Sequence, residues 1–343
     1  MKKPFLTSIL LIMTAITINA QQGDFPKLTG PYLGQKPPGM TPEIFAPGIV
    51  STGMREFASV FSPEGNLFFF TNSSAPFATL LLMEQIYDRW TSPQVASFSG
   101  RYRDLDMMFS YDGSRLFFCS NRPVNGSQEP RQDMDIWYVE KLATGWDSPV
   151  HLGDMINSNT QEYYPCLTRD GTLYFTSTRE GGLGGGDIYR CQLIHGKYEA
   201  PQNIGEPINT PSPEGDLYIA PDESYIIVTC YGRPDGLGSG DLYIGFRAKD
   251  GSWTPMKNMG APINSYANEH CPVVTFDGKY LFFTSYRSNI KMPPDSPLTF
   301  DDIKKMQTSA GNGIGGDIYW VDAKIIEELK PDELKRRMLP MKQ

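Results

Sequence analysis

Five segments of the chain repeat one pattern, and this repetition limits the fold more than any other feature of the sequence. Each copy has a short apolar segment, a tight polar turn and a second segment rich in aromatic residues. The turns end at Gly65, Gly113, Gly171, Glu223 and Gly278. Because turns of the Asp-Gly type join antiparallel strands, each repeat is expected to open with a β-hairpin.

Two further strand-like segments follow the hairpin. The third segment reads Asp-Ile-Trp-Tyr at 135–138 and Asp-Ile-Tyr at 187–189, and most copies place a Gly-rich loop before it. The glycines of these loops, such as 184–186, are expected to sit in tight turns with positive φ. The fourth segment begins at an aromatic residue shortly before a proline, as at Trp146 and Pro149. Four short strands in each of five repeats predict a β-propeller.

The two ends of the repeat region complement each other. The fifth repeat has no fourth strand, because the chain turns helical at 323–329 after its third strand. Residues 43–52 carry the fourth-strand pattern but precede the first repeat, so we expect them to pair with 317–321 and remove a free sheet edge. The predicted fold is all-β: a five-bladed β-propeller closed by an N-terminal strand, with a short C-terminal helix.

The third repeat carries the clearest family signature. Its run from Glu162 to Arg179, followed by Gly-Gly-Gly-Asp-Ile-Tyr at 184–189, resembles the TolB-like, WD-type propeller repeat of bacterial envelope proteins. The resemblance covers residues 41 to about 322. It implies the fold, but the family includes binding and scaffold proteins, accessory domains of peptidases and glycan lyases, so it does not select one function.

The first twenty residues are typical of an export signal. Lys2 and Lys3 precede an apolar stretch at 5–18, and Ala20 offers a small residue for cleavage before Gln21. An uncleaved anchor is the alternative. The expected organisation is a signal peptide (1–20), an N-terminal extension (21–40), the propeller (41–322) and a helical tail (323–343), in a periplasmic or secreted protein without a transmembrane span once the signal is removed.

Charge and cysteine content exclude some functions. The chain has 39 acidic and 31 basic residues and a net charge of −8, which argues against nucleic acid as a partner. Its 5 cysteines have no metal-ligand spacing. Most are expected to be buried thiols, although one disulfide could form.

One acidic residue recurs nine positions before the last residue of every turn. In four repeats, an arginine lies eight to ten positions after that same turn residue. A hairpin brings such positions together, so each acid should lie beside its arginine at one rim of the channel. The first repeat has Asn72, Ser73 and Ser74 in place of the arginine. The acids are Glu56, Asp104, Glu162, Glu214 and Glu269, and the arginines are Arg122, Arg179, Arg233 and Arg287.

These pairs allow two interpretations. They could orient each hairpin, since arginine forks suit carboxylates, or they could form a polar funnel for a ligand. Glu56, which lacks an arginine, and His270, which follows Glu269, are the most distinctive ligand-binding candidates, and all ten residues are retained as such. No catalytic residue is assigned. No cofactor is expected, although a cation could bind at the rim.

An insertion at 288–313 contains a helix-like segment with Thr299 as N-cap. It could cover the channel mouth or form a surface loop. The leading functional hypothesis is an exported, non-catalytic binding or scaffold propeller for a glycan, a peptide or an envelope protein. The alternatives are a glycan hydrolase or lyase that uses rim carboxylates, and a propeller that joins a larger cell-surface complex through its side.

Overall fold

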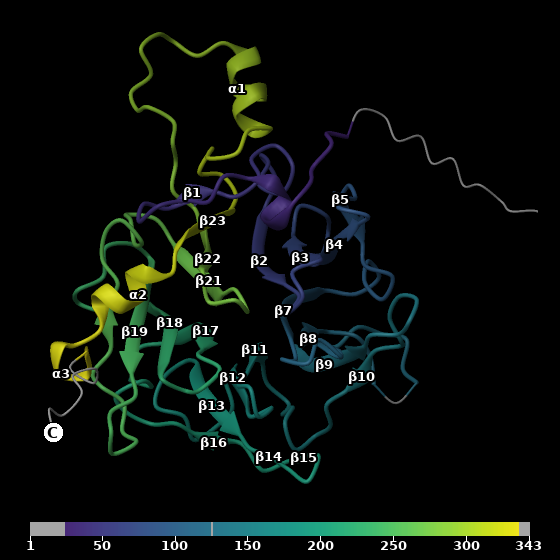
Figure 1. Cartoon of the computed structure of the whole chain (residues 1–343), viewed down its shortest axis with the longest axis vertical. Helices are drawn as coiled ribbons and strands as arrows, with labels where there is room; N and C mark the ends of the chain where they lie inside the picture. The colour runs from purple at the N-terminus through teal and green to yellow at the C-terminus, as the bar shows by residue number, and fades with distance from the viewer. Residues whose placement is uncertain (1–24, 125, 336–343) are drawn as a thin grey trace, which may run out of the picture.

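A computed structural model describes residues 25–124 and 126–335. Its sheets are arranged radially around a central axis, and the chain passes through them in sequence order (Figure 1). This confirms the five-bladed propeller. The predicted signal peptide and its cleavage site lie outside the described residues.

Each blade is an antiparallel sheet whose first strand lies nearest the axis. Blade 1 contains β2 (Glu56–Phe61), β3 (Leu67–Asn72), β4 (Thr79–Ile86), β5 (Arg89–Trp90) and β6 (Gln94–Val95). Blade 2 contains β7 (Asp104–Phe109), β8 (Arg115–Ser120), β9 (Asp135–Glu140) and β10 (Val150–His151). Blade 3 contains β11 (Glu162–Leu167), β12 (Leu173–Ser177), β13 (Asp187–Cys191) and β16 (Gln202–Asn203), with an outer hairpin of β14 (Leu193–Ile194) and β15 (Lys197–Tyr198). Blade 4 contains β17 (Glu214–Ile219), β18 (Tyr225–Tyr231), β19 (Gly240–Phe246) and β20 (Lys257–Asn258). Blade 5 contains β21 (Glu269–Val274), β22 (Tyr280–Ser285), β23 (Asp317–Asp322) and β1 (Glu43–Ile44).

The N-terminal strand closes the ring as predicted. In the fifth blade, β1 pairs antiparallel with β23, with Glu43 opposite Trp320 and Ile44 opposite Tyr319. The next residue, Phe45, is fully buried, and its ring packs against aromatic rings of both blade 1 and blade 5. Hydrogen bonding and aromatic packing therefore join the first and last blades.

The fourth strands are short because a side chain replaces part of their pairing. In blades 2, 3 and 4, a buried asparagine accepts from the N–H and donates to the C=O of one residue in the third strand. Such buried backbone groups need a partner. These asparagines are Asn157, Asn209 and Asn264.

The Gly-rich loops cross the boundaries between blades. A Cβ on Gly184 would lie 2.6 Å from the carbonyl oxygen of Thr210, and one on Gly186 would lie 2.7 Å from that of Glu214. Neither glycine has a positive φ. The expectation of positive φ at 184–186 is therefore wrong, because these residues are glycine to allow the loop to approach the next blade.

Three α-helices lie outside the sheets of the described chain. Helix α1 (Phe300–Gln307) has the predicted Thr299 N-cap, in a full capping box. It lies beyond the edge of the ring and not over its centre (Figure 1), so the insertion does not cover the channel. Helices α2 (Lys324–Leu329) and α3 (Asp332–Lys335) follow the last strand, and a 3₁₀ turn spans Pro31–Gly34.

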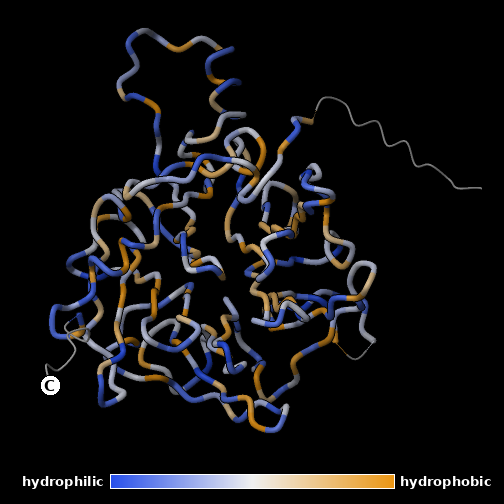
Figure 2. Tube along the Cα trace, viewed as in Figure 1, coloured by the Kyte–Doolittle hydropathy of each residue, from blue (hydrophilic) through white to orange (hydrophobic). Residues whose placement is uncertain are grey.

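The core lies between the sheets. Apolar and polar residues alternate along much of the ring, and the arm that carries α1 also has hydrophobic positions (Figure 2). All five cysteines are buried and none forms a disulfide, which agrees with the thiol expectation. No helix in the described parts of the chain combines the length and apolar character needed to span a bilayer.

Candidate functional site

The five recurring acids begin the five inner strands, and all are buried, with at most 2% of their surface exposed. Four of them form the predicted pairs with the arginine at the end of the second strand. The N–O distances are 2.7 Å for Asp104–Arg122, 3.1 Å for Glu162–Arg179, 2.8 Å for Glu214–Arg233 and 3.3 Å for Glu269–Arg287.

Each acid also holds the segment that arrives from the preceding blade. In blade 3, the Ser158 N–H and hydroxyl both donate to Glu162, at 2.9 and 2.7 Å, and Ser177 donates to it from the second strand. Arg179 in turn donates to the carbonyl of Ile156 in the arriving segment. One carboxylate thus ties three pieces of chain together, which gives the acid–arginine pairs a structural role.

Glu56 has no arginine partner among the described residues, as predicted, but it is not an open carboxylate. It is 1% exposed and accepts hydrogen bonds from the Thr52 N–H and hydroxyl and from the Asn72 amide. Burial raises its pKa. Burial, together with the charge of Glu56, also raises the pKa of Asp317 to about 7. The acids therefore do not form an exposed acidic rim.

The side chains that face the axis come two residues after each acid. A register shift interrupts every inner strand near this point, and most of these residues have positive φ. Such bulges re-aim side chains. The layer of side chains that face the axis consists of Ala58, Asp106, Tyr164, Asp216 and Cys271.

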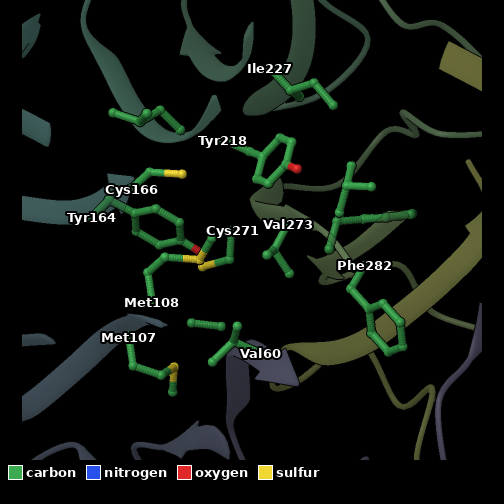
Figure 3. Close-up of a cluster of buried hydrophobic side chains, with 14 of the residues drawn as sticks. Val60, Met107, Met108, Tyr164, Cys166, Tyr218, Ile227, Cys271, Val273 and Phe282 are labelled. Carbon is green, nitrogen blue, oxygen red and sulfur yellow. The ribbon is translucent and has the colours of Figure 1, made fainter. Parts of the chain in front are cut away.

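Apolar side chains fill the channel below this layer. Figure 3 shows Tyr164 and Cys271 side by side near the axis, with Met108, Val273 and Tyr218 around them. These residues are at most 8% exposed. The channel is therefore packed below the layer and does not run open through the molecule.

Three donor groups from blades 4 and 5 converge in the layer. Asp216 Oδ2 lies 3.1 Å from His270 Nδ1 and 3.3 Å from Cys271 Sγ, and Sγ lies 3.0 Å from Nδ1. The backbone N–H of Cys271 also donates to Asp216 Oδ2, at 3.0 Å. His270, a residue predicted at the rim, is thus part of a compact polar cluster.

Three groups in the layer have strongly shifted pKa values. Burial, with the charge of Asp216 as the next cause, raises the pKa of Asp106 well above its usual range. Burial also raises the pKa of the Tyr164 hydroxyl and of the Cys271 thiol. Titratable groups shifted by burial and by a specific charged neighbour are typical of functional sites.

A cavity of about 530 Å³ opens beside this cluster, and we call it the mouth cavity. Arg55 and Arg103, each directly before a rim acid, are exposed there, and neither guanidinium pairs with an acid among the described residues. Phe57, Tyr286 and His270 supply its flat walls. Both arginines that line the cavity are therefore available to an anionic group.

Sequence reasoning located His270 and the acid–arginine pairs but missed the residues that face the axis and the mouth. The sequence did contain a signal for the residues that face the axis. The position two after each acid is Asp, Tyr, Asp or Cys in four repeats, within otherwise apolar strands. Arg55 and Arg103 could have been found as cations directly before the acids.

No family model matches the chain, and no curated protein matches it significantly. Solved structures similar to it include TolB from Acinetobacter baumannii (13% identity, 79% of this chain and 57% of that one, TM-score 0.45), a putative TolB from Agrobacterium tumefaciens (15%, 78% and 90%, 0.46) and a glycoside hydrolase (11%, 84% and 93%, 0.48). TolB-like propellers are thus among its structural neighbours, as the repeat predicted.

At these identities and TM-scores, the likeness concerns the fold alone. The chain spans little more than half the length of the Acinetobacter protein, 57%. Activities that the names of these proteins describe are therefore not assigned to this chain.

Proposed function

We propose that this protein is an exported, non-catalytic binding propeller of the bacterial cell envelope, and that its ligand occupies the mouth cavity. The observation that carries the proposal is the pair of exposed, unpaired cations, Arg55 and Arg103, beside the aromatic walls of that cavity. The buried rim acids hold the blades, so the exposed residues next to them are the ones available to a ligand.

The chemistry of the cavity favours a peptide segment of an envelope protein that carries carboxylates. Arginine binds carboxylates through its planar fork, and Phe57 and Tyr286 add apolar ring surface to the cavity wall for an apolar or aromatic side chain. Small-molecule and peptide sites commonly combine such walls with a few charged groups. An acidic sugar shares the carboxylate but not the apolar side chain.

The test is a binding screen of the mature protein, beginning near Gln21, against acidic peptides and acidic and neutral glycans. We expect an acidic peptide to bind, and R55Q/R103Q to weaken binding at least tenfold. R89Q, which removes an exposed arginine of β5 away from the cavity, should bind like the wild type. Binding that R55Q/R103Q leaves unchanged, or binding to glycans only, would refute the peptide proposal.

A second candidate function is a glycan hydrolase or lyase. The observation in its favour is the position of Asp106 near Asp216, because the raised pKa of Asp106 suits a general acid beside a second carboxylate. The candidate carboxylates are then these two and not the rim acids that hold the blades. Turnover of a glycan by the wild type that both D106N and D216N abolish would establish this function.

A further inference from the structure

We propose that Asp216, His270 and Cys271 bind a divalent metal ion of the zinc class beside the mouth cavity. The three side chains come from the start of two adjacent inner strands, β17 and β21. Carboxylate, imidazole and thiolate are all ligands of zinc. The site borders the mouth cavity through the His270 ring, but Asp216 and Cys271 do not line that cavity, so metal binding can be tested separately from peptide binding.

The spacing of the donor atoms fits a tetrahedral ion. The three separations between Asp216 Oδ2, His270 Nδ1 and Cys271 Sγ are 3.0–3.3 Å. Zinc bonds of about 2.0–2.2 Å to N and O and about 2.3 Å to S place two ligand atoms of a tetrahedron roughly 3.3–3.6 Å apart. An outward movement of a few tenths of an ångström would admit the ion.

A nucleophilic triad is a poorer explanation of the same contacts. In a Cys-His-Asp arrangement, one imidazole nitrogen faces the thiol and the other faces the carboxylate. Here a single nitrogen, His270 Nδ1, contacts both Cys271 Sγ and Asp216 Oδ2. Convergence of three donors on one point is the geometry of ligands around an ion.

The imidazole is held in the orientation that such a site requires. Its ring is stacked between Phe57 and Tyr286, with centroids 6.1 and 5.6 Å away. The Cys271 N–H donates to the same Asp216 oxygen, Oδ2, at 3.0 Å and so holds this carboxylate in place. Locked ligands of this kind reduce the cost of assembling a metal site.

The remaining imidazole nitrogen supports the same assignment. His270 Nε2 is buried and has no hydrogen-bond partner among the described residues. A metal bound at Nδ1 would leave the proton on Nε2. Three protein ligands also leave one tetrahedral position open, as in zinc sites that bind a further molecule.

The experiment uses the mature protein, reduced and stripped with a chelator, and titrates it with Co²⁺ and with Zn²⁺. We expect one ion per chain, a thiolate-to-Co²⁺ charge-transfer absorption in the near ultraviolet, and displacement of Co²⁺ by Zn²⁺. Zinc should also raise the melting temperature, because it binds only the folded chain at this site.

C271S should remove the charge-transfer band, and D216N and H270Q should each weaken Zn²⁺ binding at least tenfold. C191A is the matched control, because Cys191 is also a buried, free cysteine but lies on β13, outside the cluster. If C271S does not fold, the D216N and H270Q affinities decide. No stoichiometric Zn²⁺ binding by the wild type, or binding that these variants leave unchanged, would overturn the proposal.

Discussion

Ser51 and Ile318 exchange two hydrogen bonds across 267 residues of sequence: the serine hydroxyl accepts from the Ile318 N–H at 3.0 Å and donates to its carbonyl at 3.3 Å. Asn209 makes the same pair of bonds to Ile188 within blade 3. A serine from the N-terminal segment therefore takes, in the closing blade, the role that an asparagine has in the others.

Replacing Ser51 by alanine should lower the free energy of unfolding by about 1–3 kcal/mol, because the buried Ile318 N–H loses the Ser51 hydroxyl, while the Ile318 C=O still accepts from the Phe45 N–H. Chemical denaturation measures the change. S74A, at an exposed position of the loop after β3, should have a much smaller effect. Equal effects of the two variants would show that the Ser51 bonds do not contribute to closure.

Phe45 provides a second test of closure. Its buried ring lies 5.3 Å from the ring of Phe68 in blade 1 and 5.0 Å from that of Phe282 in blade 5. F45A should cost about 3–5 kcal/mol, while F300A, at a ring that is 73% exposed on α1, should change stability by less than about 0.5 kcal/mol. Thermal and urea unfolding of both variants would check this.

Glu162 and Glu56 should respond differently to the same substitution. E162Q removes the charge that pairs with the largely buried Arg179, and an uncompensated buried charge costs on the order of 3–5 kcal/mol. E56Q leaves no arginine without its partner, and the glutamine oxygen can still accept a hydrogen bond from the Thr52 hydroxyl. We therefore expect a clear loss of melting temperature only for E162Q. Equal losses would contradict the assigned difference.

Asp317 should make stability depend on pH. Its pKa in the folded protein, about 7, lies above the value of 3.8 expected for the unfolded chain. The stabilisation of its protonated form is complete below pH 3.8 and is lost as the pH rises through 7.

D317N should abolish this component while it keeps an acceptor for the Gly311 N–H. The stability of the wild type relative to D317N should therefore fall by on the order of 2–4 kcal/mol between pH 4 and pH 8. Unfolding of both proteins across this range measures it, and a difference that does not vary with pH would refute the shifted pKa.

The hairpins and acid–arginine pairs were predictable because hairpin symmetry relates them within one repeat. Residues Asp104 and Arg122, equally distant from their turn, meet as expected. The residues that face the axis carry a recurring polar signal, but their direction was hard to assign because the bulge between Leu105 and Met108 breaks the two-residue alternation from which the facing of side chains is judged. Asp216 meets His270 only through the placement of neighbouring blades, which no local pattern encodes.

The closing strand also has a consequence for how the chain reaches its folded state. Ser51 is synthesised 267 residues before Ile318. The segment that completes the last blade is therefore made well before β23, the strand with which it pairs. During that interval its backbone groups and the Phe45 ring lack their native contacts, which favours aggregation and slows folding. Chaperone protection of the nascent N-terminal segment would be most valuable before the fifth blade has been made.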